Sequence, residues 1–531
     1  MDSKKIEEGK VDNDDEFLDG LIPSEETQAK DFMTTEANGN GVIVAVFDTG
    51  CDPAADGLQT CPDGSPKIVD IVDATGCCDV SMDKVVDLPE KNENDWIELK
   101  GLSGRTLKLD AKLTNPTKKF RLGLKQAYEL FSKPLVKRMK SERKRVFDEK
   151  HEKLLRQVQN KLVSFERNDN NKDKKKEKED LEARISCLKD TMKSYQDLGP
   201  IYDCVVYHDG KEWLALVDTS ETGDLRDKTP MTNYRVRFEH DTCDDISMQT
   251  YCVNIYDEGR TLSVVTDAGA HGTHVASIIG AYDKDREELR GIAPGCKIVA
   301  VRIGDRRVSG SMETCLGMVR AADAVRRNRC DVVNMSYGEP TVSCSTSNSA
   351  VLKEFRDLVE KDNVIFVTSA GNAGPALSTC GAPCEPLSDV VIGVGAYVSK
   401  DMMSAQYSLL ENIPQTAFTW TSVGPSRNGH LGVTIMAPGT QFLSLSLFLS
   451  LSLSYIHTHT HQYTPHTRTH THTHTRRCCH CGRSNVVFKV QAADEWYVDG
   501  ITKRCGCSVF DPFKTEKRQD FVQCTSCCSL N

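Results

Sequence analysis

Short apolar runs recur in two parts of the chain, and amphipathic stretches separate them. Two runs near the N-terminus cover residues 42–47 and 67–74, and later ones cover 297–303, 331–336, 364–369, 390–397 and 433–437. Continuous apolar runs of this length are typical of strands that are covered on both faces of a parallel sheet. Residues 275–281, 311–327 and 352–361 have the composition and spacing of helices. This alternation predicts an α/β fold with a doubly wound parallel sheet.

A long charged stretch interrupts the α/β pattern. Residues 118–167 and 172–197 are dense in Lys, Arg and Glu, their apolar residues recur at helical spacing, and a polar turn begins at Asn168. We expect two long helices packed as a hairpin. Such a hairpin suits an assembly or gating element, and it suits a solvated surface feature without a partner equally well. Residues 204–218 predict a β-hairpin that turns at Asp209-Gly210.

These patterns divide the chain into five expected parts. They are a polar N-terminal arm (1–33), a first part of the sheet domain (34–75), an insertion with the charged helical hairpin and the β-hairpin (76–255), a second part of the sheet domain (256–439), and a low-complexity, Cys-rich tail that we expect to be disordered (440–531).

Composition limits the classes of partner. Lys and Arg (67) against Asp and Glu (77) give a net charge of −10, which does not favour nucleic acid. The one long apolar run, 442–456, is interrupted by serines and is shorter than the roughly 20 residues of a spanning helix, so we expect no membrane partner. The first residues show no secretory signal, and the 22 cysteines are therefore expected to be reduced thiols in a cytoplasmic protein.

Asp48 and His271 are the first candidates for catalysis. Asp48 follows an apolar strand and precedes Thr49-Gly50, a placement from which a carboxylate can orient an imidazole. Alone this motif is weak, because it also fits an ordinary strand-end turn or one half of an aspartic protease site. His271 opens the segment His-Gly-Thr-His-Val-Ala and can act as a general base at a helix start. His274 more simply packs within that helix, and zinc is disfavoured because no third ligand stands at a usable spacing.

Asn372 is a candidate oxyanion donor. It follows a predicted strand in Ser369-Ala370-Gly371-Asn372. Its amide can donate a hydrogen bond to a tetrahedral intermediate, and losing such a donor typically costs about 2.7–4 kcal/mol of transition-state stabilisation. By itself an Asn in this context is a turn residue, so the assignment depends on Asp48 and His271.

With these motifs the chain resembles the subtilisin-like serine peptidases over residues 31–439. It is most similar to their large cytosolic branch, which removes tripeptides from free N-termini. The resemblance implies Asp/His/Ser acyl transfer on oligopeptides with a free N-terminus, no cofactor or metal, and a homo-oligomer when full-length. It also implies that Glu313 and Glu339, with Gly338 in the substrate strand, bind the substrate's α-ammonium group. A desolvated ammonium needs nearby negative charge, although either Glu alone would by default be a solvated surface residue.

The nucleophile motif of this family, Gly-Thr-Ser-Met, is missing. Residues 442–454 largely alternate Ser and Leu, and 457–475 largely alternate His and Thr, as translated dinucleotide repeats do. The possible codons of 492–503, read one nucleotide later, allow Gly-Thr-Ser-Met-Ala-Ser-Pro-Asn. We therefore expect a retained intron or a misjudged splice site, and a chain that lacks the Ser nucleophile and is inactive.

Two alternatives remain open for a chain of this kind. It could be a non-catalytic subunit that assembles with full-length copies. Less favoured is a zinc-binding tail on an inactive domain, because Cys478 and Cys481, with Cys524 and Cys527, have the spacing of paired zinc knuckles.

Overall fold

Two compact units make up the described part of the chain. The first contains residues up to 77, 233–240 and from 265 onward, and the second contains 78–232 and 241–264. The domain boundaries predicted from the sequence, at 75/76 and 255/256, remain predictions. Most of the predicted arm and all of the predicted tail, 440–531, lie outside the described residues. The computed structural model describes residues 27–32, 37–88, 96–167, 175–308, 311–339, 349–407, 413–427 and 429–439.

A largely parallel sheet forms the centre of the first unit, as predicted. Strand β1 (Ile43–Asp48) pairs in parallel with β13 on one side and with β14 on the other, so the chain reverses its winding direction at β1. The strand order is β17-β16-β15-β14-β1-β13-β2, and β18 also pairs with β16. Only the short β17 runs antiparallel to its neighbour. The bounds are β2 Ile68–Asp73, β13 Lys297–Arg302, β14 Val332–Met335, β15 Ile365–Ser369, β16 Ile392–Val398, β17 Thr416–Ala417 and β18 Ile435–Pro438.

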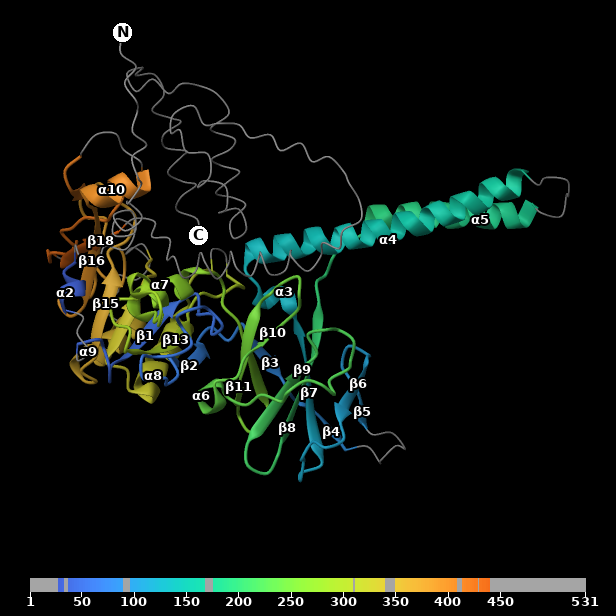
Figure 1. The fold of residues 1–531 in the computed structure, drawn as a ribbon, viewed down its shortest axis with the longest axis horizontal. Helices are drawn as coiled ribbons and strands as arrows, with labels where there is room; N and C mark the ends of the chain where they lie inside the picture. The colour runs from blue at the N-terminus through green and yellow to red at the C-terminus, as the bar shows by residue number, and fades with distance from the viewer. Residues whose placement is uncertain are drawn as a thin grey trace, which may run out of the picture. The chain divides into compact units, whose positions relative to one another are not determined.

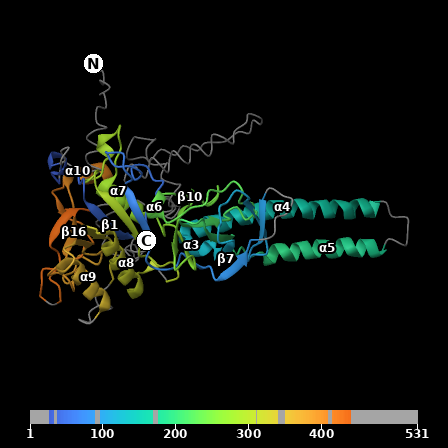
Figure 2. The same cartoon turned by 90° about the horizontal axis from the view of Figure 1, so that it is seen from below.

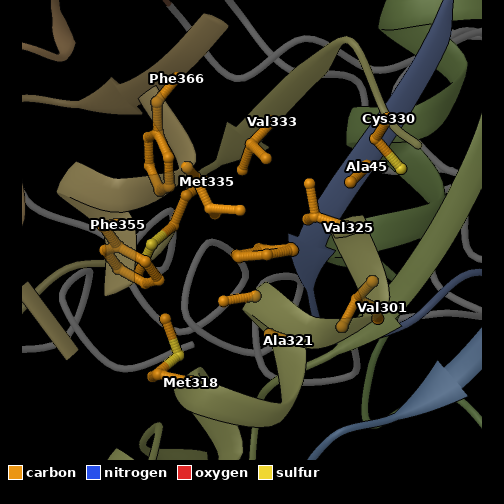
Figure 3. Close-up of a cluster of buried hydrophobic side chains, with 14 of the residues drawn as sticks. Ala45, Val301, Met318, Ala321, Val325, Cys330, Val333, Met335, Phe355 and Phe366 are labelled. Atoms are coloured by element: carbon orange, nitrogen blue, oxygen red, sulfur yellow. The ribbon is translucent and has the colours of Figure 1, made fainter. Parts of the chain in front are cut away.

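The main core lies between this sheet and helices α8 and α9 (Figures 1 and 3). Phe47, Phe355 and Phe366 meet there, with ring centroids 4.9–6.3 Å apart. Figure 3 shows Phe355 and Phe366 with Met318 and Met335 between strands and helices. The helices of the first unit are α2 Ala29–Phe32, α6 Tyr234–Arg237, α7 His271–Gly280, α8 Cys315–Asn328, α9 Ala350–Glu360 and α10 Lys400–Tyr407, with a 3-10 turn at Glu287–Leu289.

The opposite face of the sheet is covered unevenly. Helix α7 contacts β1 and β13, whose residues there are buried. Farther along, Ile365 is 53% exposed while its neighbour Phe366, on the other face of β15, is 1% exposed. The register places Ile435 of β18 on the same face as Ile365, and its side chain is also exposed. A parallel sheet is normally buried on both sides, so the β15–β18 end of this face lacks a cover among the described residues.

The second unit is built from antiparallel sheets. Strands β4, β7, β8 and β9 form one sheet, β10, β11, β12 and β3 another, and β5 pairs with β6. The predicted β-hairpin is present as β8 and β9, with His208 opposite Trp213. The strand bounds are β3 Asp79–Ser81, β4 Lys84–Asp87, β5 Trp96–Lys100, β6 Thr106–Asp110, β7 Lys119–Gln126, β8 Ile201–His208, β9 Trp213–Val217, β10 Asp241–Thr242, β11 Thr250–Tyr256 and β12 Thr261–Val265.

The charged hairpin is present, but its first helix begins later than predicted. Helices α4 (Lys133–Arg167) and α5 (Lys175–Ser194) lie side by side (Figure 2). The prediction that residues 118–126 are helical is wrong, because β7 and then the short helix α3 (Ala127–Leu130) precede α4. Phe120 and Leu122 alternate with more exposed residues and pack into the core of this unit. This alternation has a period of two residues, as in a strand. The charged residues around it made the segment resemble the start of a charged helix.

Ion pairs hold the base of the hairpin. Arg143 of α4 bonds to Asp197 at 2.9 Å and to Glu221 at 3.4 Å, and Arg105 bonds to the same Glu221 at 2.9 Å. None of the described helices combines the length and the apolar character needed to cross a membrane.

Candidate active site

Asp48 ends β1 on the side of the sheet that α7 covers. Its neighbour Phe47 points into the core beneath α8 and α9, so alternation along the strand turns Asp48 toward the opposite face. The carboxylate is fully buried, and its Oδ1 accepts a hydrogen bond from the Thr49 N–H at 2.7 Å. A buried carboxylate needs such partners to remain ionised.

Thr49 and two glycines fix the start of α7 against Asp48. The Thr49 hydroxyl donates to the Gly269 carbonyl at 2.6 Å and accepts from the Gly272 N–H at 2.9 Å. Gly50 has φ +96°, which favours glycine. A Cβ on Gly272 would collide with the Gly50 carbonyl and would lie 3.1 Å from the Asp48 Cβ. The two motifs therefore fit together through their small residues.

Asp48 and His271 are hydrogen-bonded although 223 positions separate them. Nδ1 of His271 lies 2.8 Å from Oδ1 and 2.9 Å from Oδ2 of Asp48. This bond, opposed by partial burial, raises the pKa of His271 above its usual value. The His271 side chain is 55% exposed while Asp48 is buried, so the outer part of the ring can meet a reactant. A buried carboxylate behind an accessible imidazole is the orienting arrangement of a general base.

His274 lies one turn further along α7. Burial and the neighbouring His271 lower the pKa of His274 to about 4. Its lowered pKa makes His274 a weaker base than His271, whose pKa is raised.

Asn372 lies in the loop that follows β15. Because β1, β14 and β15 are parallel, this loop leaves the same edge of the sheet as Asp48. Ser422 holds the loop, since its hydroxyl accepts from the Ala373 N–H at 3.0 Å and its own N–H donates to the Gly371 carbonyl at 2.9 Å. Asn372 itself is exposed. Its place at this edge is compatible with donation to an oxyanion.

Glu313 and Glu339 come together from two elements. Glu313 immediately precedes Thr314, the N-cap of α8, and Glu339 follows β14. Burial first, and then the nearby carboxylate of Glu339, raise the pKa of Glu313 to about 7. Glu313 therefore keeps its proton up to near neutral pH. Two carboxylates this close favour a cation between them.

The backbone of Glu339 is anchored to a neighbouring turn. Its N–H donates to the Ala382 carbonyl at 3.1 Å, and the Ala382 N–H donates to the Glu339 carbonyl at 2.8 Å. A Cβ on Gly338 would lie 3.0 Å from the Ala382 carbonyl, so this glycine permits the close pairing.

The Tyr337 hydroxyl is influenced by the charges of both Asp48 and Glu313. Burial first, and then the charges of Asp48 and Glu313, raise the pKa of this hydroxyl. One aromatic side chain thus lies in the electric fields of both Asp48 and Glu313. The segment in which a Ser nucleophile is expected, 440–531, lies outside the described residues.

Sequence reasoning missed several supporting residues. Thr49, Ser422 and Ala382 position the candidate residues without reacting themselves. Thr49 belongs to the motif that drew attention to Asp48, so a signal was available for it. Ser422 and Ala382 act through contacts distant in sequence, and no local pattern marks them.

The chain is similar to known proteins in both sequence and fold. Residues 39–479 match the model of the subtilase family. Tripeptidyl-peptidase 2 of Arabidopsis thaliana is 40% identical over 439 residues, and that of Drosophila melanogaster is 39% identical over 445. These alignments cover 80% of this chain and 31% and 30% of the two relatives. A crystal structure of tripeptidyl peptidase 2 superposes with a TM-score of 0.56 at 32% identity, covering 83% of this chain and 34% of that one. The chain thus spans about a third of the length of the curated relatives that it matches.

Proposed function

Because the chain belongs to the subtilase family, whose fold it has, we propose that its site is built for the serine exopeptidase reaction of the tripeptidyl-peptidases. The observation that carries this proposal is the bond between buried Asp48 and accessible His271, at the sheet edge that also bears the Glu313–Glu339 pair. The substrates are oligopeptides with a free N-terminus.

The chemistry follows from the roles of these groups. In a chain with the nucleophile, His271 takes the proton of the Ser hydroxyl as the oxygen attacks the scissile carbonyl, and Asp48 stabilises the resulting imidazolium. The Asn372 amide donates to the oxyanion of the tetrahedral intermediate. His271 then returns the proton to the leaving amine.

The carboxylate pair restricts the reaction to chain ends. A peptide's α-ammonium group takes the place of the proton on Glu313 and pairs with both carboxylates. An internal segment of a longer chain has no ammonium group and would leave two carboxylates facing one another. Free N-termini are therefore preferred.

The chain as it stands is proposed to be inactive. Its sequence lacks the family's Ser motif, so no acyl-enzyme forms. A fluorogenic Ala-Ala-Phe substrate tests this directly. We expect no release of fluorophore above buffer; release that disappears in His271→Ala would overturn the proposed inactivity.

Peptide binding tests the amine site without needing catalysis. We expect Ala-Ala-Phe peptides with a free N-terminus to bind more tightly than their N-acetylated forms, as measured by calorimetry. Glu339→Gln should remove the difference between the two peptides. Glu287→Gln, at a highly exposed carboxylate, is the matched control and should preserve it. Equal affinity of both peptides for the unaltered chain would contradict the assignment.

A second candidate function is that of a non-catalytic subunit. The chain spans about a third of its relatives and keeps the Asp48–His271 pair without the Ser motif, which favours assembly with full-length copies in the cytoplasm. Co-expression with a tagged full-length homologue tests this candidate, and failure to co-purify would exclude it. The zinc-binding alternative concerns cysteines outside the described residues, and it would require zinc in the purified chain.

A further inference from the structure

A buried pair of cysteines lies beside the turn that anchors Glu339. Cys380 and Cys384 are 3% and 0% exposed and belong to one small hydrophobic cluster. The Glu385 N–H donates to the Gly381 carbonyl at 2.8 Å, which closes the intervening residues into a single turn. Cys380 immediately precedes this turn and Cys384 lies within it.

The two sulfur atoms lie near each other, against the same glycine. The Cys384 thiol donates to the Gly432 carbonyl at 3.0 Å, and both cysteines belong to the same three-residue buried cluster. A Cβ on Gly432 would lie 3.0 Å from the Cys380 sulfur, and a Cβ on Gly393 would collide with that of Cys384. Two glycine backbones therefore hold the sulfurs together. The interaction between the two thiol groups lowers the pKa of Cys380 and raises that of Cys384.

We propose that Cys380 and Cys384 form an oxidation site, which a hydroperoxide converts into an intramolecular disulfide. Cys380, as thiolate, attacks a peroxide oxygen; the O–O bond breaks, the leaving hydroxide takes up a proton, and Cys380 becomes a sulfenic acid. The Cys384 sulfur then attacks the Cys380 sulfur, the S–O bond breaks, and the proton of Cys384 leaves with the oxygen as water. Two thiols and one hydrogen peroxide give one disulfide and two waters. A dithiol reductant reverses the change.

Backbone hydrogen bonds connect the segment between the two cysteines to the candidate active site, so oxidation of the cysteines can change that site. Between the two cysteines, the Gly381 N–H donates to Ala370, which precedes the Asn372 loop, and Ala382 exchanges two hydrogen bonds with Glu339. A disulfide holds its sulfurs about 2.05 Å apart, much closer than two separate thiols. Because the flanking glycines leave no free space, residues 381–383 must adjust. The effect on the amine site rests on the proposed function, whereas the disulfide itself does not.

Mass spectrometry of one tryptic peptide tests the proposal on the full chain. Peptide 362–400 contains Cys380 and Cys384 and no other cysteine, and peptide 194–211 contains only Cys204. After hydrogen peroxide treatment, alkylation in denaturant and digestion, we expect peptide 362–400 to have lost two hydrogens, about 2 Da. Both of its cysteines should escape alkylation, and dithiothreitol should restore their reactivity.

Internal controls make the result decisive. Cys204 is buried to the same degree as the pair, and burial raises its pKa to about 12, so its free thiol shows that the oxidant does not react with every buried cysteine. Exposed Cys187 and Cys315 report that the oxidant was effective. Complete alkylation of Cys380 and Cys384 under conditions that oxidise Cys187 would overturn the proposal.

Single variants assign the order of the two steps. Cys384→Ala should leave a Cys380 sulfenic acid that dimedone traps, whereas Cys380→Ala should leave Cys384 unoxidised. Dimedone labelling of Cys384 instead would reverse the assigned roles and contradict the proposed order. If either variant unfolds, the peptide result on the unaltered chain decides alone.

Hydrogen exchange tests the route to Glu339. The amides of Glu339 and Ala382 should exchange faster in the oxidised chain, and unchanged exchange in a chain with the disulfide would refute the transmitted effect. Neither readout requires peptide binding, so the outcome is independent of the proposed function.

Discussion

The proton on Glu313 determines how the carboxylate pair behaves near neutral pH. Burial and Glu339 raise the pKa of Glu313 from 4.5 to about 7. Between these values the folded chain holds a proton that the unfolded chain has released, so the free energy of unfolding falls as pH rises through this window. As the pH rises above 7, Glu313 becomes ionised and favours a cationic ligand.

Peptide binding should therefore depend on pH. We expect the affinity for a free-amine tripeptide to rise several-fold between pH 6 and 7.5, because ionised Glu313 attracts the ammonium, which itself titrates near 7.7–8.0. Glu313→Gln should flatten this rise, and an N-acetylated peptide should show none. Calorimetric titrations at each pH measure it; an unaltered rise in the Gln variant would contradict the role of Glu313.

The Asp48–His271 bond should be visible in the titration of the imidazole. Asp48 raises the pKa of His271 above 6.5, and Asp48→Asn removes the negative charge while keeping the side-chain volume. We expect the His271 pKa to fall below 6.5, since burial then acts alone. Proton NMR of the ring follows this titration. A His271 pKa that does not move would show that the two side chains are not coupled in solution.

Asp48, His271 and Asn372 could be singled out from sequence because each sits in a short motif whose residue types are tied to chemistry. The approach of Glu313 to Glu339 could not, because it depends on how α8 and β14 pack. Ser422 was missed for the same reason: it is bonded to the Asn372 loop from about 50 positions away.

At the scale of elements, α7 approaches β1 closely only because of Gly272. A methyl group there would collide with the Gly50 carbonyl, so Gly272→Ala should push α7 away from Asp48. We expect the His271 pKa to fall toward or below 6.5, as for Asp48→Asn, when measured by NMR. Gly269→Ala is the matched control, because its nearest neighbour would be 3.9 Å away. Equal pKa values in both variants would argue against this packing constraint.

Strand β15 has two unlike faces. Phe366 packs against Phe47 and Phe355, whereas Ile365 is half exposed on the face without a cover among the described residues. We expect Phe366→Ala to lower the free energy of unfolding by about 3–5 kcal/mol and Ile365→Ala by no more than about 1 kcal/mol. Urea unfolding measures both, and similar losses would show that Ile365 is buried in solution.

The strands and helices of the parallel sheet were predictable because their apolar runs are long and few polar residues interrupt them. Strand β7 was not, because its alternating Phe120 and Leu122 lie in a charged stretch that continues directly into α4. A period of two over so few residues is easily read as part of a longer helical pattern.

At the scale of the whole molecule, each of the two units has a main hydrophobic core of its own. The core around Phe47 and Phe366 belongs to the first unit, and the core around Phe120 and Tyr207 to the second. The insertion was predictable as a charged interruption between Asp48 and His271. Its antiparallel sheets were only partly visible, because the pairings of β4 with β7, β7 with β8 and β12 with β3 join strands distant in sequence.

Separate cores predict separate unfolding transitions. We expect Phe120→Ala to lower the midpoint of one calorimetric transition by roughly 6–20 °C and to leave the other unchanged. Phe366→Ala should do the reverse. A single transition that shifts equally in both variants would show that the two cores unfold together.

In the sequence, the main part of the second unit is inserted between parts of the first, so the strands of the first unit's sheet are synthesised far apart in time. Strand β1 lies between β13 and β14, and both are synthesised about 250 residues or more after it. At roughly 5–20 residues per second, a ribosome needs on the order of 12–60 s to supply these neighbours. During that interval β1 is an apolar segment with unpaired edges on a nascent chain, while the unit that follows it can already fold. We infer that the emerging chain depends on chaperones at this stage, well before His271 can meet Asp48.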